Sequence, residues 1–224
     1  MILGIYCSGS LGKEILNLII SGQIENRWEK ILFIDDISAE QSWNGFNILK
    51  FKDIKQNFSC SETEIVIATG EPYYRDMIWQ RVKEAGYPLA TLISRNVSFG
   101  LGTKFREGCI IFPFCYIGND VFFGENVIVH AGAKVESECL VGSNSFVSLG
   151  AFVGAETRIG ERVFIGPNAV VKDNMTVESD SILGIGAVLV KSAEACGVYV
   201  GNPARFLRKN ESHKLFGNSI VSEH

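Results

Sequence analysis

From Val97 onward the apolar and polar positions follow a strict period of six residues. When the chain is written in hexads from this residue, the third place is Phe, Ile, Val or Leu in all sixteen hexads as far as residue 192. A side chain that recurs at every sixth position fills the interior of a three-sided coil, so the pattern predicts a parallel β-helix. Three hexads close one coil, and five complete coils would span roughly 25 Å at the spacing of paired strands. Glycine is common at the fourth place, where we expect the chain to turn sharply.

Every eighteenth residue lies on the same face of such a coil, and the outward second place distinguishes the three faces. Two faces mix charged, polar and apolar residues, whereas the third is apolar throughout, at Ile110, Ile128, Phe146, Phe164 and Ile182. An unbroken apolar column in contact with solvent is a liability. The column therefore predicts a subunit interface, with three coils packed around a three-fold axis.

The first 93 residues have a different pattern, in which short apolar runs alternate with amphipathic stretches. Strands are indicated by LGIY (3–6), KILFI (30–34), FNIL (46–49), EIVIAT (64–69) and PLATLI (88–93). Two helices are expected, one with an apolar face of Leu11, Ile15, Leu18 and Ile19, and one over 72–85 that begins near Pro72. This alternation is typical of a small α/β layer with a parallel sheet, the size of one nucleotide-binding unit.

The two patterns predict an α/β + β protein. We expect a small Rossmann-like N-terminal domain over 1–93, a parallel β-helix over 94–208 and a C-terminal tail over 209–224.

The composition excludes several classes of protein. The 224 residues carry a formal net charge of −4, so no basic surface indicates a nucleic-acid partner. No apolar run is long enough to span a membrane, and the N-terminus lacks the basic start of a signal peptide, which favours a cytoplasmic protein. The six cysteines show no CxxC spacing and no metal-like pairing with histidine, so free thiols and no metal site are expected. Cys109, Cys115 and Cys139 occupy first places of hexads, and we interpret them as packing residues rather than nucleophiles.

Four segments carry a family resemblance in order along the chain: FIDD (33–36), LISRNVSFG (92–100), DSILGIGAVLVK (180–191) and GVYVGNPAR (197–205). With them, residues 1–208 resemble the hexapeptide-repeat acyltransferases of the sialic-acid O-acetyltransferase-like and nucleotide-linked 4-amino-sugar N-acetyltransferase family. The resemblance implies a left-handed β-helix, a homotrimer, acetyl-CoA as the acetyl donor and active sites between neighbouring β-helices. It also implies that the acceptor is a nucleotide-linked amino sugar, whose nucleotide binds the N-terminal domain.

The loop CSGSLG follows the first strand and opens a helix, so its backbone N–H groups can bind phosphate oxygens. Family members usually have a glycine-rich run with a histidine here, whereas in this chain Cys7 replaces the first glycine and Leu11 the histidine. The acidic pair at 35–36 ends the second strand, where a carboxylate commonly accepts from a ribose hydroxyl. The family uses these positions for ribose and base contacts. The predicted nucleotide-sugar site consists of Gly9, Ser10, Leu11, Asp35, Asp36, Thr69 and Gly70.

The resemblance places CoA in a groove between the C-terminal coils of two subunits. The Ala155 backbone N–H would point at the thioester carbonyl and stabilise the oxyanion that develops there. Arg205, close to Arg208 and Lys209, would bind CoA phosphates. The predicted acetyl-CoA site consists of Phe146, Ala155, Pro167, Ile185 and Arg205.

The family's catalytic histidine aligns with Ser137, which keeps the acidic neighbour Glu138, and its second histidine aligns with Phe146. A serine hydroxyl is a poor base by itself, whereas a histidine with a pKa of about 6.5 suits proton transfer at neutral pH. His130 lies one corner before Ser137 and matches a family position near the acceptor.

Three hypotheses stay open on these residues. In the first, the base has moved to His130 and meets the site across a subunit boundary. In the second, no protein base is needed, because the amine arrives deprotonated or loses its proton to water or to Glu138, and placement supplies most of the rate. In the third, catalysis is lost and the trimer only binds a sugar nucleotide.

The function predicted is acetyl transfer from acetyl-CoA to the amine of a nucleotide-linked 4-amino-4,6-dideoxy sugar, in bacterial surface-glycan biosynthesis such as that of lipopolysaccharide. The alternatives are an O-acetyltransferase of the sialic-acid type and a non-catalytic binder.

Overall fold

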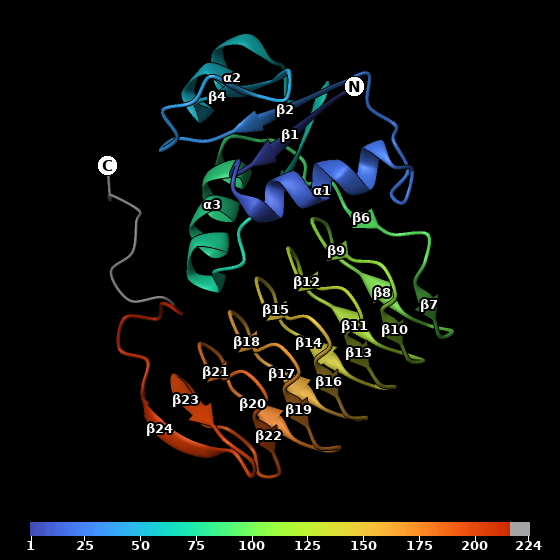
Figure 1. The fold of residues 1–224 in the computed structure, drawn as a ribbon, viewed down its shortest axis with the longest axis vertical. Helices are drawn as coiled ribbons and strands as arrows, with labels where there is room; N and C mark the ends of the chain where they lie inside the picture. The colour runs from blue at the N-terminus through green and yellow to red at the C-terminus, as the bar shows by residue number, and fades with distance from the viewer. Residues whose placement is uncertain (216–224) are drawn as a thin grey trace.

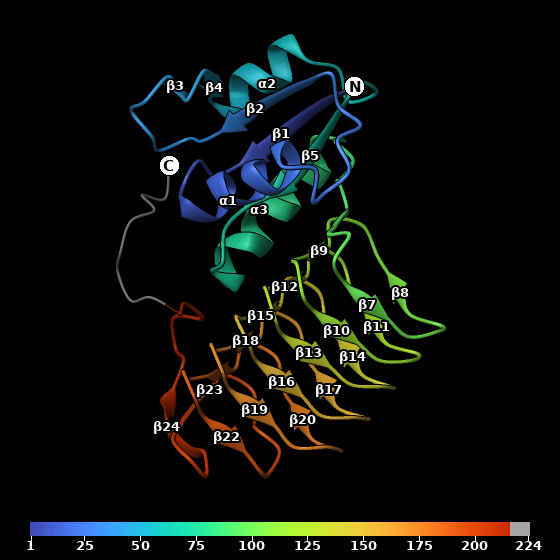
Figure 2. The same cartoon turned by 45° about the vertical axis from the view of Figure 1, so that its right-hand side comes forward.

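The computed structural model describes residues 1–215, so the predicted C-terminal tail lies outside the described residues from 216 onward. An α/β layer of one sheet and three helices is stacked on one end and one side of a long stack of coils (Figures 1 and 2). Of the helices in the described part, none is both long and apolar enough to cross a membrane.

The α/β layer has a five-stranded sheet of order β3-β4-β2-β1-β5. Its strands are parallel, as predicted, except for the β3–β4 hairpin. Helices α1 and α3 cover the face of the sheet that looks towards the coils, and α2 lies on the opposite face (Figure 1). The bounds are β1 Ile2–Tyr6, α1 Ser10–Ile20, β2 Lys30–Ile34, β3 Ser42–Trp43, β4 Phe46–Leu49, α2 Phe51–Asn57, β5 Thr63–Ile67 and α3 Pro72–Glu84.

The coils form a left-handed parallel β-helix with three sheets, in which each strand pairs with the strand eighteen residues further on. Coil sheet 1 contains β6 Leu92–Ile93, β9 Ile110–Ile111, β12 Ile128–Val129, β15 Phe146–Val147, β18 Phe164–Ile165, β21 Ile182–Leu183, and the hairpin β23 Gly197–Val200 and β24 Arg205–Lys209. Coil sheet 2 contains β7 Ser98–Phe99, β10 Tyr116–Ile117, β13 Lys134–Val135, β16 Phe152–Val153, β19 Val170–Val171 and β22 Val188–Leu189. Coil sheet 3 contains β8 Lys104–Phe105, β11 Phe122–Phe123, β14 Leu140–Val141, β17 Arg158–Ile159 and β20 Thr176–Val177. Each corner is named below by the two sheets it joins, so corner 1–2 follows a strand of coil sheet 1.

The third place of each hexad fills the interior of the coils, as predicted. From Ile111 to Leu189 every third-place side chain is buried. The first coil is the exception, because Phe99 is 41% exposed where no coil stacks above it. Phe105 covers part of this end by stacking on Phe123, with ring centroids 5.0 Å apart.

The expectation that fourth-place glycines provide the sharp turn was wrong. The left-handed backbone conformation falls at the sixth place instead, for example at Asn126 (φ 56°) and Glu138 (φ 61°). A fourth-place glycine is needed for another reason: a Cβ on Gly118 or Gly142 would collide with backbone of the next coil. Glycine therefore permits the coils to stack closely at these corners.

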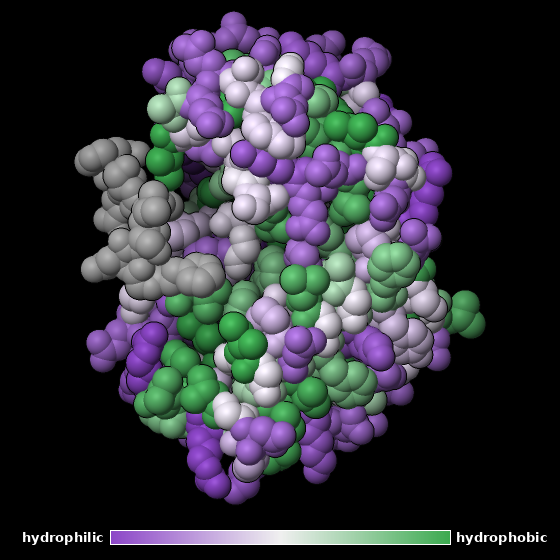
Figure 3. All heavy atoms as spheres, in the orientation of Figure 1, coloured by the Kyte–Doolittle hydropathy of each residue, from purple (hydrophilic) through white to green (hydrophobic). Residues whose placement is uncertain are grey.

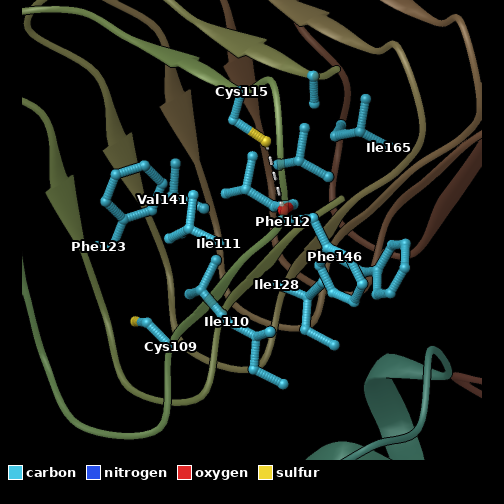
Figure 4. Packing of buried hydrophobic residues seen from close by; sticks show 14 of the residues in the cluster. Cys109, Ile110, Ile111, Phe112, Cys115, Phe123, Ile128, Val141, Phe146 and Ile165 are labelled. Carbon is cyan, nitrogen blue, oxygen red and sulfur yellow. Dashed lines mark hydrogen bonds between the residues drawn. The ribbon is translucent and has the colours of Figure 1, made fainter. Parts of the chain in front are cut away.

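The apolar column on coil sheet 1 is covered within one chain, which corrects its interpretation as a subunit interface. Ile110 and Ile128 are fully buried, and Phe146 is 6% exposed. Figure 4 shows these three side chains on the side of the coils that faces the α/β layer. Gly70 packs directly on the Phe146 ring, since a Cβ there would lie 3.3 Å from Cε2. The part of the column formed by Ile110, Ile128 and Phe146 is thus the surface on which the α/β layer docks, and we call this contact the seam.

Candidate functional site

A cavity of about 630 Å³ opens at the seam, between the carboxyl ends of β1, β2 and β5 and the outer face of coil sheet 1. Its α/β wall consists of Cys7, Ser8, Gly9, Asp35, Ile37, Ser38, Thr69, Gly70, Glu71 and Tyr74. Its other wall consists of Phe146, Ser148 and Phe164 from the coils and Leu215 from the C-terminal segment. One pocket therefore brings together the predicted residues Gly9, Asp35, Thr69 and Gly70 with Phe146. Ser10, Leu11 and Asp36 are not part of its lining.

Asp35 holds the loop after β1 in place. Its carboxylate accepts from Ser8 N at 2.9 Å and Ser8 Oγ at 2.7 Å, and from the backbone N–H groups of Ile37 at 3.0 Å and Ser38 at 2.8 Å. Burial alone would raise the pKa of Asp35, but these donors outweigh it and the pKa is lowered. Asp35 is therefore a permanent anion whose lone pairs are largely satisfied by the protein.

Asp36 points away from the cavity and ties elements of the α/β layer together. It accepts from Tyr6 Oη at 2.6 Å, from Arg81 Nη1 at 2.7 Å and from the Phe51 N–H at 2.9 Å. Its predicted nucleotide contact stays a prediction, and both of its oxygens already have partners in the chain.

The loop between β1 and α1 reaches the cavity at the N-terminus of a helix, where backbone N–H groups lack partners within the helix. Gly9 is the N-cap of α1 and lines the pocket. Because glycine has no side chain, no side-chain hydrogen bond caps this helix. Cys7 adopts φ 81°, a left-handed conformation. A Cβ on Gly12 would collide with the Cys7 carbonyl, so glycine is required where α1 packs on this turn. Burial raises the pKa of Cys7 to about 12, so its thiol stays protonated at neutral pH.

His130 lies at corner 1–2, directly behind the coil wall of the cavity. Its ring stacks on Phe112, with centroids 4.2 Å apart, and is tilted against Phe146 at 5.8 Å. Its Nε2 atom is 3.5 Å from Glu14 Oε2 on α1, while Nδ1 is buried without a hydrogen-bond partner. Burial lowers the pKa of His130, and the charge of Glu14 opposes this shift only in part. The imidazole is therefore neutral at pH 7, with the Nε2–H directed at a carboxylate.

The other predicted catalytic residues lie at a different corner of the same chain. Ser137 and Glu138 follow β13 at corner 2–3, away from the cavity, and Ser137 Oγ accepts from Asn119 N at 3.0 Å. A single chain does not bring them to His130.

The predicted acetyl-CoA residues are similarly divided. Ala155 lies at corner 2–3, and its N–H donates to Asp173 Oδ1 at 3.1 Å. Pro167 and Ile185 lie at corner 1–2, where Ile185 is 78% exposed. Arg205 is exposed on β24. These residues can line one groove only if corners of two chains meet.

Arg75 on α3 is the main polar contact across the seam, and no feature of the sequence indicated it. It is fully buried, and its guanidinium donates to the carbonyls of Ile67 at 2.7 Å, Thr69 at 3.0 Å and Asn126 at 2.6 Å. It also donates to Asn126 Oδ1. Burial lowers the pKa of Arg75 to about 9, so it still carries a charge at pH 7. Arg75 thereby fixes the Thr69 wall of the cavity against corner 3–1.

Below Arg75, polar side chains at the sixth place of corner 3–1 form a ladder: Asn126, Asn144, Arg162 and Asp180. At its lower end Asp180, Cys196 and His213 bring potential metal ligands within 4.8 Å of one another. Arg162 already donates to both Asp180 oxygens, at 2.7 and 3.0 Å. A guanidinium so placed opposes a second cation, so the cluster fits an ion pair better than a metal site.

The buried cysteines of the coils behave as packing residues. Burial raises the pKa of Cys109 and Cys115 to about 12 and that of Cys139 to about 11. Their thiols donate to backbone carbonyls of the next coil, for example Cys109 Sγ to Gly124 O at 3.1 Å. Protonated thiols at these positions are poor nucleophiles.

Comparison with known proteins gives matches to both halves of the chain. The family model of the PglD N-terminal domain matches residues 3–82, and that of the hexapeptide repeat of succinyl-transferase matches residues 116–149 and 156–191. The acetyltransferase domain of PglB from Neisseria gonorrhoeae FA1090 is 27% identical with a TM-score of 0.85, and the match covers 92% of this chain and 99% of that one.

Two further solved structures share the fold. A perosamine N-acetyltransferase from Caulobacter crescentus, in complex with CoA and GDP-perosamine, is 21% identical with a TM-score of 0.82 over 92% of this chain and 97% of that one. WeeI from Acinetobacter baumannii AYE is 23% identical with a TM-score of 0.68 over 92% of this chain and 100% of that one. The two family models match the two halves of the structure in order, so this chain is similar to proteins that join a PglD-type N-terminal domain to hexapeptide repeats.

Proposed function

We propose that this protein transfers an acetyl group from acetyl-CoA to the amine of a nucleotide-linked 4-amino-4,6-dideoxy sugar, in the cytoplasm, during bacterial surface-glycan biosynthesis. The observation that carries the proposal is the cavity at the seam, because it joins the phosphate-binding type of loop at Gly9 to Phe146 on the coils. Two of the structural relatives support it: a PglB acetyltransferase domain in complex with acetyl coenzyme A, and the Caulobacter enzyme with CoA and GDP-perosamine.

In the proposed reaction the acceptor nitrogen attacks the thioester carbonyl carbon, and the carbon–sulfur bond breaks after a tetrahedral intermediate. We assign the base to His130. With Nε2–H directed at Glu14, the lone pair of the neutral ring is on Nδ1, the nitrogen without a partner. Nδ1 is buried and His130 does not line the cavity, so the ring must move before Nδ1 can take the proton from the amine and return it to the departing CoA thiolate. The Ala155 N–H would stabilise the oxyanion after this N–H has given up its hydrogen bond to Asp173.

The test is incubation of the protein with acetyl-CoA and a panel of UDP-, GDP- and dTDP-linked 4-amino sugars, followed by measurement of thiol release. Release with one of these acceptors, and none without an acceptor, is expected. The same panel with the amine replaced by a hydroxyl tests the O-acetyltransferase alternative.

A non-catalytic binder is the second candidate function, and Ser137 favours it, because this serine stands where the family has its histidine and its hydroxyl is engaged by Asn119. Nucleotide-sugar binding without thiol release for any acceptor would establish the binder.

The Glu14–His130 pair predicts how activity depends on pH. Only neutral His130 accepts a proton, so activity should rise as the pH passes its pKa, which burial holds below about 6.5, and then level off. The Glu14 charge raises that pKa, so Glu14→Gln should move the acidic limb to lower pH. The measurement is the pH profile of thiol release for wild type, Glu14→Gln and the control Glu25→Gln, which removes an exposed carboxylate. Titration of the substrate amine affects all three proteins equally. If the acidic limb of the Glu14→Gln profile coincides with that of wild type, the interaction between Glu14 and His130 is contradicted.

We propose a homotrimer whose contacts involve corner 1–2, since the apolar column is used within the chain. Phe114, Leu149 and Ile185 are 74%, 48% and 78% exposed at this corner. Figure 3 shows apolar residues exposed on the half of the molecule formed by the coils. A charge at such a contact is desolvated on assembly. Leu149→Glu should therefore yield monomers in light scattering coupled to size-exclusion chromatography. Leu207→Glu, which changes a more exposed leucine on β24, should remain a trimer. A trimeric Leu149→Glu would exclude this corner as the interface.

A further inference from the structure

Glu71 places a buried carboxylate at the end of the cavity nearest the coils. It follows β5 as the N-cap of α3 and is only 5% exposed. Its neighbour Gly70 packs on Phe146, so Glu71 lies where the α/β wall meets the coil wall. In the proposed function the nucleotide lies towards Asp35 and the donor towards Phe146, which puts Glu71 at the level of the reacting part of the acceptor.

The C-terminal segment presents a nitrogen to this carboxylate. The backbone N–H of Leu215 donates to both oxygens of Glu71, at 2.8 and 2.9 Å, across 144 positions of sequence. Leu215 itself lines the cavity. The segment is anchored further down by Asn210, whose N–H donates to Cys196 O at 2.7 Å and whose Nδ2 donates to Asp180 O at 3.2 Å. The Leu215 N–H thus occupies a position between the two carboxylate oxygens where an amine would bind.

The charges of the cavity point to the same kind of ligand group. Among its described lining residues Asp35 and Glu71 are the acidic ones, and none is basic. Asp35 already accepts from four donors on its own loop. Among the partners of Glu71, the Leu215 N–H comes from a distant segment, so a donor of the substrate can replace this N–H without disturbing the α/β layer. A hydrogen bond between a carboxylate and an ammonium group is stronger than one to a neutral N–H.

We propose that Glu71 is the residue that recognises the acceptor amine, and that in the free protein the Leu215 N–H occupies the position of that amine. This inference rests on the proposed function and names a specificity residue for it. Glu71 is a positioning group that binds and orients the amine in its charged form. The ammonium group loses one proton to solvent before attack, and the second proton is taken by the base and passed to the departing thiolate. Acceptor binding and the Leu215 contact are mutually exclusive, so the C-terminal segment competes with the substrate.

The experiment measures binding by calorimetry in the absence of acetyl-CoA, with two ligands: a nucleotide-linked 4-amino sugar and the same compound with a 4-hydroxyl group. Wild type should bind the amino sugar at least tenfold more tightly than the hydroxyl analogue. Glu71→Gln should abolish most of that preference by weakening amino-sugar binding about tenfold, the usual difference between a charged and a neutral hydrogen bond. Glu84→Gln removes an exposed carboxylate from the other end of α3 and should keep the preference.

A second pair of variants tests the competition. Leu215→Pro removes the N–H from the contact, whereas Leu215→Ala keeps it and removes only the side chain. Leu215→Pro should bind the amino sugar more tightly than Leu215→Ala does. An unchanged preference in Glu71→Gln, with wild-type binding intact, would overturn this inference and leave the proposed function standing. If wild type binds no nucleotide-linked amino sugar, the acceptor in the proposed function is wrong and the inference falls with it.

Discussion

Replacing Arg75 with methionine is expected to lower the free energy of unfolding by about 3 kcal/mol, because several buried backbone carbonyls lose their hydrogen-bond donors at once. Arg75 is fully buried and donates to the carbonyls of Ile67, Thr69 and Asn126. Methionine has a similar shape, so the change removes hydrogen bonds without a large cavity. Removal of the charge recovers part of its desolvation cost, so the loss is smaller than the sum of the separate bonds.

The measurement is urea unfolding followed by circular dichroism at one fixed protein concentration. Arg158→Met is the matched control, since Arg158 is an exposed arginine on coil sheet 3 and its replacement should change stability by less than about 0.5 kcal/mol. Wild-type stability in Arg75→Met would mean that the seam does not depend on this guanidinium. Weaker nucleotide-sugar binding at unchanged stability would assign Arg75 to the cavity wall alone.

Replacing His130 is expected to have the largest effect on catalysis. A positioned general base contributes about 10²- to 10⁴-fold to a rate, so His130→Gln should reduce kcat for acetyl transfer by at least 10²-fold. His130→Phe should reduce it as much, although its ring can keep the stacking on Phe112 and Phe146. The comparison separates the chemistry of the nitrogens from the packing of the ring.

Rates of thiol release at saturating acceptor, together with thermal unfolding of each variant, check this prediction. His130→Phe with wild-type stability and a large loss of kcat would support the base. Wild-type kcat in the same variant would exclude it and favour transfer without a protein base. Reduced stability in both variants with unchanged kcat would leave His130 a packing residue.

The fold of the coils could be predicted because every coil repeats the same requirement. An interior third place admits only apolar side chains, and sixteen hexads satisfy it. The α/β layer was also predictable from its longer strands and from α1 and α3. The short elements β3 and α2 were missed, since two residues and seven residues carry too little periodicity.

The apolar column shows the limit of such patterns. The sequence indicates that Ile110 and Ile128 are covered by another surface. It does not indicate which surface covers the column. The α/β layer of the same chain does so in the structure. Which surface covers the column depends on packing between residues that are far apart in the sequence, and a local pattern does not contain this information.

The candidate site was predictable only in part. Gly9, Asp35, Thr69 and Gly70 follow strands of a parallel sheet, whose carboxyl ends share one edge, and they do line one cavity. Glu71 and Glu14 carried no signal, because a single acidic residue at a helix start or on a helix face is common. Their significance depends on Leu215 and His130, which are more than a hundred residues away.

The seam has a consequence for recombination between relatives. Three features combine residues before 93 with residues of the coils: the cavity, the Arg75–Asn126 contact and the Glu14–His130 pair. A crossover at the start of the coils therefore does not exchange an independent module. A chimera with a foreign first half would inherit a new acceptor preference only if it also imported the matching corner residues at 126 and 130.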